Sequence, residues 1–264
     1  GDEILLWNWY VGTDYLIETI RFDDSTTWLM ADIASAMRLG TPYDDHLIGW
    51  VADVVFDGLA GNDTIEGGPL NDTINGGLGN DIITDQNGEN IVYGDDGDDT
   101  ITMTGWSDPS SGNPVGVRSW VPAEVLFGSG DLIDGGAGAD TIVISHMTNN
   151  NVLGGLGNDR IAVSWNLTTV DAVLAQQHIN VLNGGLGDDI LMGYAGSDTY
   201  LLAPGDGTDR INDWANSQAN TDTIVFSGIN VPADTNFSLV GSNLEILYGS
   251  DKVVVENWID AEYR

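Results

Sequence analysis

The chain has 264 residues, of which 41 are Asp or Glu and only 7 are Lys or Arg, so its formal net charge is -34. This charge makes nucleic acid and anionic membrane surfaces unfavourable partners, and it opposes compaction unless cations bind. The absence of cysteine excludes disulfides and thiolate metal sites. The hydrophobic content of 42% and the 9 tryptophans argue against disorder. Hard cations bound by carboxylates are therefore the expected means of neutralisation.

Residues 1–39 come first and are predicted to cap the array that follows. Within them, Ala31–Arg38 has the composition of a short helix. Trp7, Trp9 and Trp28 are suited to cover the open end of a repeat array, because such arrays need terminal units of their own. No apolar run reaches the length that spans a membrane, so insertion into a membrane is not expected of this segment.

Residues 40–102 form the first run of a nine-residue repeat. The gapless nonads begin at Gly40, Gly49, Gly58, Gly67, Gly76, Asp85 and Gly94. The fifth, Gly76–Thr84, fits G-G-x-G-x-D-x-U-x at every specified position. Position eight is always apolar, as in Leu47, Phe56, Ile65, Ile74, Ile83, Val92 and Ile101. Such a column predicts stacked short strands with this side chain inward and Gly-rich turns between them, two nonads to each turn of a flattened coil.

Position six carries the candidate metal ligands. Because one turn of the coil takes two nonads, alternate nonads fall on the same edge. One edge then carries Asp45, Asp63, Asp81 and Asp99, and the other carries Val54, Asp72 and Asn90. Calcium binds carboxylate and carbonyl oxygens, whereas transition metals prefer nitrogen or sulfur. Because the first edge has an aspartate at every turn and the second does not, we expect the first edge to bind calcium well and the second poorly. The alternative is that these are ordinary turn residues that need no ion, but the strict spacing favours the metal.

A less regular second run is predicted over 126–211, after an insertion loop at 103–125 and with another insertion near 163–177. Its matching carboxylates are Asp131, Asp140, Asp159, Asp189, Asp198 and Asp209. The stretch Ile144–Leu153 carries one extra residue, so the pairing of these aspartates is left open. We expect Asn149 or Asn150, together with Asn180, to substitute for aspartate by binding the metal through their side-chain carbonyl oxygens.

Residues 212–264 are predicted to form a C-terminal β cap, with antiparallel strands between 222 and 258. The strand candidates are Asp222–Phe226, Ser238–Val240 and Leu244–Tyr248. A larger repeat joins the two ends, because Asp2–Trp9 aligns with Asp251–Trp258 at a constant offset of 249. We infer a parent protein with tandem units, whose neighbouring repeat units are expected partners of this one.

The nonads resemble the RTX, or haemolysin-type, calcium-binding repeat family. Gly1–Ile33 resembles the calcium-binding-related element of that family through Asp14-Tyr15-x-Ile17-Glu18 and Phe22-Asp23-Asp24-x-x-x-Trp28. The resemblance implies an all-β fold, a parallel β-roll or β-solenoid in two runs with a cap at each end. It also implies several Ca²⁺ ions, each between successive turns and bridged by Asp45 with Asp63, Asp63 with Asp81, or Asp81 with Asp99.

The same resemblance implies a secreted, extracellular or cell-surface protein. The segment would pass unfolded through a type I secretion channel, fold in millimolar calcium outside the cell and act as a rigid spacer in its parent.

Two other functions are weighed against this one. Trp106, Trp120 and Trp165 lie in the predicted insertions and motivate a glycan- or surface-binding adhesin module, although hydrophobic packing of the loops onto the coil is the favoured explanation. An enzyme is not expected, because no H-E-x-x-H, G-x-S-x-G or phosphate-binding loop occurs and His46, His146 and His178 stand alone. The segment would then be a non-catalytic accessory part of a secreted enzyme or toxin.

Overall fold

The computed structural model describes residues 19–21, 23–29, 38–49, 53–86, 88–105, 130–145, 149–164, 179–194, 196–213, 221–229 and 235–259. Every regular element within these ranges is a β-strand. Accordingly, the described ranges hold no helix of the length and apolar character that crossing a membrane requires.

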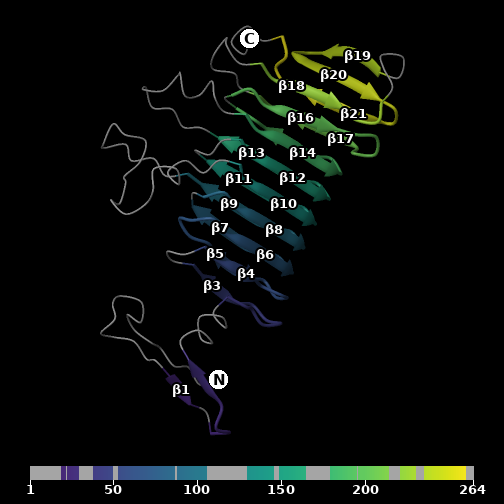
Figure 1. Ribbon diagram of the computed structural model, residues 1–264. Coiled ribbons are helices and arrows are strands. Elements are labelled where there is room, and N and C mark those ends of the chain that lie inside the picture. The colour runs from purple at the N-terminus through teal and green to yellow at the C-terminus, as the bar shows by residue number, and fades with distance from the viewer. Residues whose placement is uncertain are drawn as a thin grey trace, which may run out of the picture.

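Two large sheets face each other. The eight-stranded sheet consists of β4 (Val55–Asp57), β6 (Thr73–Leu78), β8 (Ile91–Asp96), β10 (Leu132–Ala137), β12 (Asn151–Leu156), β14 (Val181–Leu186), β16 (Thr199–Leu202) and β18 (Thr223–Phe226). The eleven-stranded sheet consists of β3 (His46–Ile48), β5 (Thr64–Glu66), β7 (Ile82–Gln86), β9 (Thr100–Thr104), β11 (Thr141–Ser145), β13 (Arg160–Ser164), β15 (Ile190–Met192), β17 (Thr208–Ile211), β21 (Asp251–Val255), β20 (Asn243–Tyr248) and β19 (Thr235–Val240). Successive strands from β3 to β18 alternate between the sheets, so the chain winds as a flattened coil (Figure 1). The predicted parallel β-roll is confirmed.

The strand register gives the length of each turn. In the first run, His46 pairs with Thr64, Thr64 with Ile82, and Ile82 with Thr100, which confirms a turn of 18 residues. Later turns span 41, 19, 30 and 20 residues, yet each strand still pairs in parallel with the one before it. The additional residues are therefore accommodated outside the sheets.

The two long insertions occur in equivalent turns. They separate β9 from β10 and β13 from β14, and residues 106–129 and 165–178 lie outside the described residues. Residues 103 and 163 were predicted to begin the insertions, but β9 continues to Thr104 and β13 to Ser164. Met103 and Val163 are buried, so their apolar side chains extend the sheet into both stretches.

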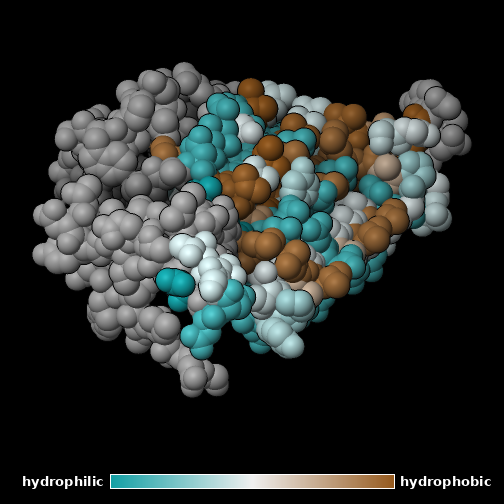
Figure 2. Space-filling model, turned by 60° about the horizontal axis from the view of Figure 1, so that its bottom comes forward, coloured by the Kyte–Doolittle hydropathy of each residue, from teal (hydrophilic) through white to brown (hydrophobic). Residues whose placement is uncertain are grey.

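The core is the apolar column of position eight. In the second run the column continues through Ile133, Ile142, Val152, Ile161, Leu182, Leu191, Tyr200 and Ile211, all of which are buried like their counterparts in the first run. Each fully buried aliphatic side chain contributes about 1.5–3 kcal/mol of transfer free energy. The outward-facing side chains are mixed: exposed Val55 and Ile82 stand beside polar neighbours, and Figure 2 shows hydrophobic patches separated by hydrophilic ones.

Glycine at position four of one set of turns is required by backbone packing. Gly79 has a φ of 122°, and a Cβ built on it would lie 2.0 Å from the carbonyl oxygen of Gly61 one turn earlier. The same approach recurs at Gly97, Gly138, Gly157 and Gly187, at 1.7 to 1.9 Å. No side chain fits at such a distance, so these turns stack directly on one another.

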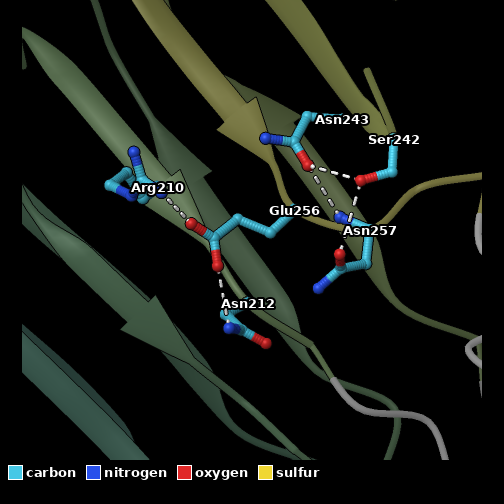
Figure 3. Close-up of polar contacts among 6 residues, drawn as sticks. All are labelled: Arg210, Asn212, Ser242, Asn243, Glu256 and Asn257. Atoms are coloured by element: carbon cyan, nitrogen blue, oxygen red, sulfur yellow. Dashed lines mark hydrogen bonds and ion pairs between the residues drawn. The ribbon is translucent and has the colours of Figure 1, made fainter. Parts of the chain in front are cut away.

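The C-terminal strands close one sheet. β21 pairs in parallel with β17 and antiparallel with β20, which in turn pairs antiparallel with β19. Polar contacts hold this hairpin to the coil (Figure 3): Arg210 of β17 forms an ion pair with Glu256, and Asn212 Nδ2 donates to Glu256 Oε2 at 2.8 Å. Asn243 Oδ1 accepts a hydrogen bond from the backbone N–H of Asn257 at 3.0 Å.

One cap prediction was wrong. The stretch 222–226 was predicted as an antiparallel cap strand, but β18 pairs in parallel with β16 and belongs to the coil. Its apolar side chains Ile224 and Phe226 pack against the same core, which explains the difference. At the N-terminus, β1 (Thr19–Arg21) and β2 (Thr27–Leu29) form an antiparallel hairpin. The predicted helix at 31–38 lies outside the described residues except for Arg38, which is in a turn.

Replacing Gly79 by Ala tests the stacking of the turns. We expect the free energy of unfolding to fall by about 3 kcal/mol or more, because the new methyl group overlaps the Gly61 carbonyl and the backbone stays left-handed. The measurement is chemical denaturation in saturating calcium. Gly249→Ala is the matched control, since Gly249 has a φ of 65° with nothing within 4 Å, and it should cost only about 1 kcal/mol. Equal losses in the two variants would contradict direct stacking.

Candidate metal sites

The turns of the coil form two edges, and the structure assigns every position-six residue to one of them. On the first edge the chain passes from the eight-stranded to the eleven-stranded sheet, and position six is Asp45, Asp63, Asp81, Asp99, Asp140, Asp159, Asp189 or Asp209. On the second edge the chain passes back, and position six is Val54, Asp72, Asn90, Asp131, Asn150, Asn180, Asp198 or Asp222. The pairing that the sequence left open in the second run is thereby resolved.

Each first-edge aspartate holds the turn before it. Its Oδ1 accepts a hydrogen bond from the backbone N–H of the preceding position-six residue, as Asp81 Oδ1 does from Asp63 at 2.8 Å. Seven such bonds of 2.7 to 3.1 Å run from Asp45 to Asp209 without a break. One carboxylate oxygen per turn is thus committed to the backbone.

The other carboxylate oxygen has no hydrogen-bond partner. On the first edge this is the buried Oδ2 of Asp63, Asp81, Asp99, Asp140, Asp159 and Asp189. Only the two end members of the edge have a protein partner: Asp45 Oδ2 accepts from the Thr41 hydroxyl at 2.9 Å, and Asp209 Oδ2 accepts from the Tyr248 hydroxyl at 3.3 Å. A buried oxygen without a partner is costly, so the six interior carboxylates call for a ligand.

Oxygen atoms from two successive turns converge beside five of these six carboxylates. A Cβ built on Gly94 would lie 2.3 Å from Asp99 Oδ2 and 2.4 Å from the carbonyl oxygen of Gly135 in the next turn. The same pairing of a carboxylate with a glycine carbonyl recurs at Gly58, Gly76, Gly135 and Gly154. Calcium takes carboxylate and backbone carbonyl oxygens in a flexible shell of six to eight, so this donor set fits it.

The electrostatics also call for a cation. Burial raises the pKa of Asp81 and Asp99 to about 6 and the pKa of Asp140 and Asp189 to about 7, and nearby carboxylates of the same or adjacent turns add to the effect. None of the three ion pairs formed among the described residues includes a first-edge aspartate. The compensating positive charge therefore has to come from solution.

The interior of the second edge is built differently. Asn150 Nδ2 donates to Asn180 Oδ1 at 3.1 Å, and Asn180 Nδ2 donates to Asp198 Oδ1 at 2.9 Å, so amides supply their own donors. Asn150 has this role rather than Asn149, which is exposed. Position one, glycine along the first edge, is here the buried apolar column of Met103, Ile144 and Val163. At Asn150 and Asn180 these contacts join the turns without an ion. Asp72 and Asp131 of the same edge do have a buried Oδ2 without a partner, but amides interrupt their row, whereas the first edge has an aspartate in every turn.

Sequence reasoning missed three carboxylates, Asp85, Asp213 and Asp222. Asp85 and Asp213 occupy position one of second-edge turns, where the repeat specifies glycine. The replacement of glycine by aspartate at this position is the sequence feature from which they could have been identified. Asp85 is 1% exposed, and its Oδ1 accepts from the Gly68 backbone N–H at 2.9 Å while its Oδ2 has no partner. Burial and the nearby Asp72 raise the pKa of Asp85 to about 8.

The other candidate residues do not gather into a second site. His46 is exposed, and its Nε2 lies 2.9 Å from Glu66 Oε1. His146 and His178 lie outside the described residues, as do Trp106, Trp120 and Trp165. The adhesin interpretation, which depends on these tryptophans, therefore stays a prediction.

Two known protein families match parts of this chain. Residues 1–32 match the haemolysin-type calcium binding protein related domain. Four stretches match the RTX calcium-binding nonapeptide repeat, namely residues 39–74, 66–101, 127–143 and 177–211. No curated protein sequence matches the chain.

Among solved structures, the chain is similar to the crystal structure of extracellular lipase LipA from Serratia marcescens, with 19% sequence identity and a TM-score of 0.35. The match covers 81% of this chain and 41% of the lipase chain, so this chain spans less than half of the lipase's length.

The raised pKa values predict that the calcium-free fold is more stable in mild acid. Between the unfolded pKa of about 4 and the folded values of about 6 to 7, the folded chain binds more protons than the unfolded chain. Stability without calcium should therefore fall as pH rises through this window. We expect more strand content at pH ~5 than at pH ~8 by circular dichroism in chelator-treated buffer.

General charge repulsion changes with pH in the same direction, so salt provides the control. About 0.5 M NaCl screens charges at the surface but has little effect on buried carboxylates, and the difference between the two pH values should persist. Equal strand content at both pH values, or a difference that vanishes in salt, would count against the buried carboxylates as its cause.

Proposed function

Because the chain carries RTX calcium-binding nonapeptide repeats, which bind Ca²⁺ at multiple sites, we propose that it is a structural module folded by calcium outside the cell. The observation that carries the proposal is the row of six first-edge aspartates whose buried Oδ2 atoms have no partner. Calcium supplies the positive charge and the oxygen-binding shell that this row calls for. Asp63, Asp81, Asp99, Asp140, Asp159 and Asp189 are the residues that hold it, and Asp45 and Asp209 begin and end the row.

The energetics explain why calcium decides folding. Most core-forming strands have only three to six residues, so each turn buries little apolar surface against the entropy of ordering its loop. Without cations, ionised carboxylates stacked along one edge repel each other, and the net charge of -34 adds to that repulsion. An ion held by oxygens of two successive turns reduces the repulsion between their carboxylates, lowers the net negative charge and joins those turns.

This behaviour suits export. Extracellular calcium modules bind with dissociation constants of about 0.1 to 1 mM, so the low calcium of a cytosol leaves such a chain unfolded and the external medium folds it. The segment would cross a type I secretion channel unfolded, drive folding outside and then serve as a stiff spacer in its parent. The proposal gives it no catalytic step, and it would be an accessory segment even in a parent that is an enzyme or a toxin.

A calcium titration followed by circular dichroism tests the proposal. From chelator to about 10 mM calcium, we expect a cooperative gain of strand signal with a midpoint near 0.1 to 1 mM. Magnesium at the same concentrations should give no comparable gain, because it requires a stricter octahedral shell. A chain already carrying its full strand signal in chelator would overturn calcium-driven folding.

Paired variants test whether the first edge is responsible. Asp140→Asn and Asp131→Asn are the same substitution at the same repeat position in consecutive turns, on the first and second edges. Asp140 has first-edge aspartates on both sides, whereas Asp131 follows Asn90 and precedes Asn150. We expect the calcium midpoint to rise several-fold for Asp140→Asn and less than about twofold for Asp131→Asn. Equal shifts would remove the distinction between the edges.

A further inference from the structure

The eleven-stranded sheet extends past the eight-stranded sheet at the C-terminal end of the coil. The eight-stranded sheet ends at β18, whereas the eleven-stranded sheet continues beyond β17 through β21, β20 and β19. β19 is the outermost of these strands, and within the described ranges its only neighbouring strand is β20 (Figure 1). The other long side of β19 therefore presents backbone N–H and C=O groups that can pair with a further strand.

β19 is the longest edge strand in the described part of the chain. It has six residues, whereas the other strands that end the two large sheets, β3, β4 and β18, have three, three and four. Proteins commonly protect a sheet edge by keeping its strand short or by placing a charge or a proline in it. The sequence of β19, Thr-Asn-Phe-Ser-Leu-Val, contains neither a charged residue nor proline. This edge is therefore open to the addition of a strand.

Two large apolar side chains of β19 lie exposed on the core-facing side of the sheet. Phe237 is 57% exposed and Leu239 is 59% exposed. In the strand register Phe237 lies opposite Ile246, and Leu239 lies opposite Leu244. Residues directly opposite each other share a face of the sheet, and Ile246 is buried in the core. Phe237 and Leu239 thus continue the core-facing side beyond the end of the eight-stranded sheet.

The hairpin of β19 and β20 is almost free of charge in a chain whose net charge is -34. Glu245 is the one charged residue in 235–248, and its carboxylate lies 3.7 Å from Lys252 Nζ in an ion pair. Glu245 also lies opposite Ser238, so the centre of β19 has a neutralised neighbour. A basic partner would be attracted to the acidic surfaces elsewhere, whereas a second acidic chain meets least repulsion here.

We propose that β19 is a self-association surface, which pairs antiparallel with β19 of a second copy of this chain about a two-fold axis. Such an interface is self-complementary. The core-facing sides of the two sheets coincide when the axis passes through a residue and not between two residues. With the axis at Ser238, Phe237 of each copy lies opposite Leu239 of the other, which forms two aromatic–aliphatic pairs. The two eleven-stranded sheets then become one continuous sheet.

Sedimentation equilibrium of the whole chain in about 10 mM calcium tests this surface. Over about a hundredfold range of protein concentration, the average mass should rise from that of one chain toward that of two. Leu239→Lys should raise the dissociation constant of the dimer at least about tenfold, because it buries a charge opposite Phe237 in both halves of the interface.

Ile82→Lys is the matched control for this substitution. Ile82 is 50% exposed on β7, an interior strand of the same sheet, and Arg160 and Arg210 occupy its repeat position in other turns. The same change of charge is therefore compatible with the fold at this position and should leave the dissociation constant unchanged. Circular dichroism in calcium checks that both variants keep the strand signal of the unsubstituted chain.

A cysteine scan tests the register and does not depend on the folding of Leu239→Lys. The chain has no cysteine, so a single introduced thiol reports one position. Ser238→Cys brings the two thiols together at the axis, with Cα atoms about 4.5–5.5 Å apart, and oxidation should give a covalent dimer. Asn236→Cys lies opposite Val240 in this register, so its two thiols are about 13 Å apart along the strands and should not join.

Three results would overturn the proposal. The first is an unsubstituted chain that remains a monomer at every concentration, which would leave the edge of β19 to a strand of another protein. The second is an equal change of the dissociation constant in Leu239→Lys and Ile82→Lys. The third is equal cross-linking in Ser238→Cys and Asn236→Cys.

Discussion

The structure depends on one carboxylate that serves two turns. Interior first-edge aspartates such as Asp99 use Oδ1 to hold the backbone of the preceding turn and leave Oδ2 beside a glycine carbonyl of the following turn. The glycines follow from this arrangement, because a Cβ at Gly94 would occupy the space where these oxygens converge. The sixth-position aspartate therefore depends on the glycine that begins its repeat, because that glycine leaves the space in which the oxygens converge, and neither residue performs its role without the other.

The two edges solve the problem of joining turns by different means. The first edge uses carboxylates and stacked glycine backbone, which require every turn to follow the same path. The second edge has this carboxylate contact only at some turns, such as those of Asp72 and Asp131. Elsewhere it uses amides between Asn150 and Asn180 and the buried apolar side chains of Met103, Ile144 and Val163, which require only that side chains of successive turns meet. This difference accounts for the positions of the insertions, since both long ones fall in second-edge turns. The first edge lengthens only at its last turn, next to the C-terminal hairpin.

Much of this fold could be predicted from the sequence because its signals are local. The nonad spacing specified the strands of the first run, and the column from Leu47 to Ile101 specified the core. The pairing in the second run could not be derived, because strand register is a contact between turns and residues looped out of the sheet do not change it. The alternation in Thr223–Phe226 suits a parallel or an antiparallel strand equally, so β18 was assigned to the wrong arrangement. Asp85 is visible in the sequence as a nonad that begins without glycine, whereas Asp213 stands out only when position one is aligned across the second edge.

The ends of the first edge differ from its interior in having protein donors for the second carboxylate oxygen. At the start, Thr41 donates to the free oxygen of Asp45, and at the other end Tyr248 donates to that of Asp209. Tyr248 belongs to the hairpin that also covers the edge of β17 and packs against Phe226, with ring centroids 4.9 Å apart. Protein donors can reach an end turn because one side of it is open to other elements. An interior turn has another turn on each side, so the space beside its carboxylate admits an ion but no side chain. Under the proposed function, the dependence on calcium therefore rises with the number of turns.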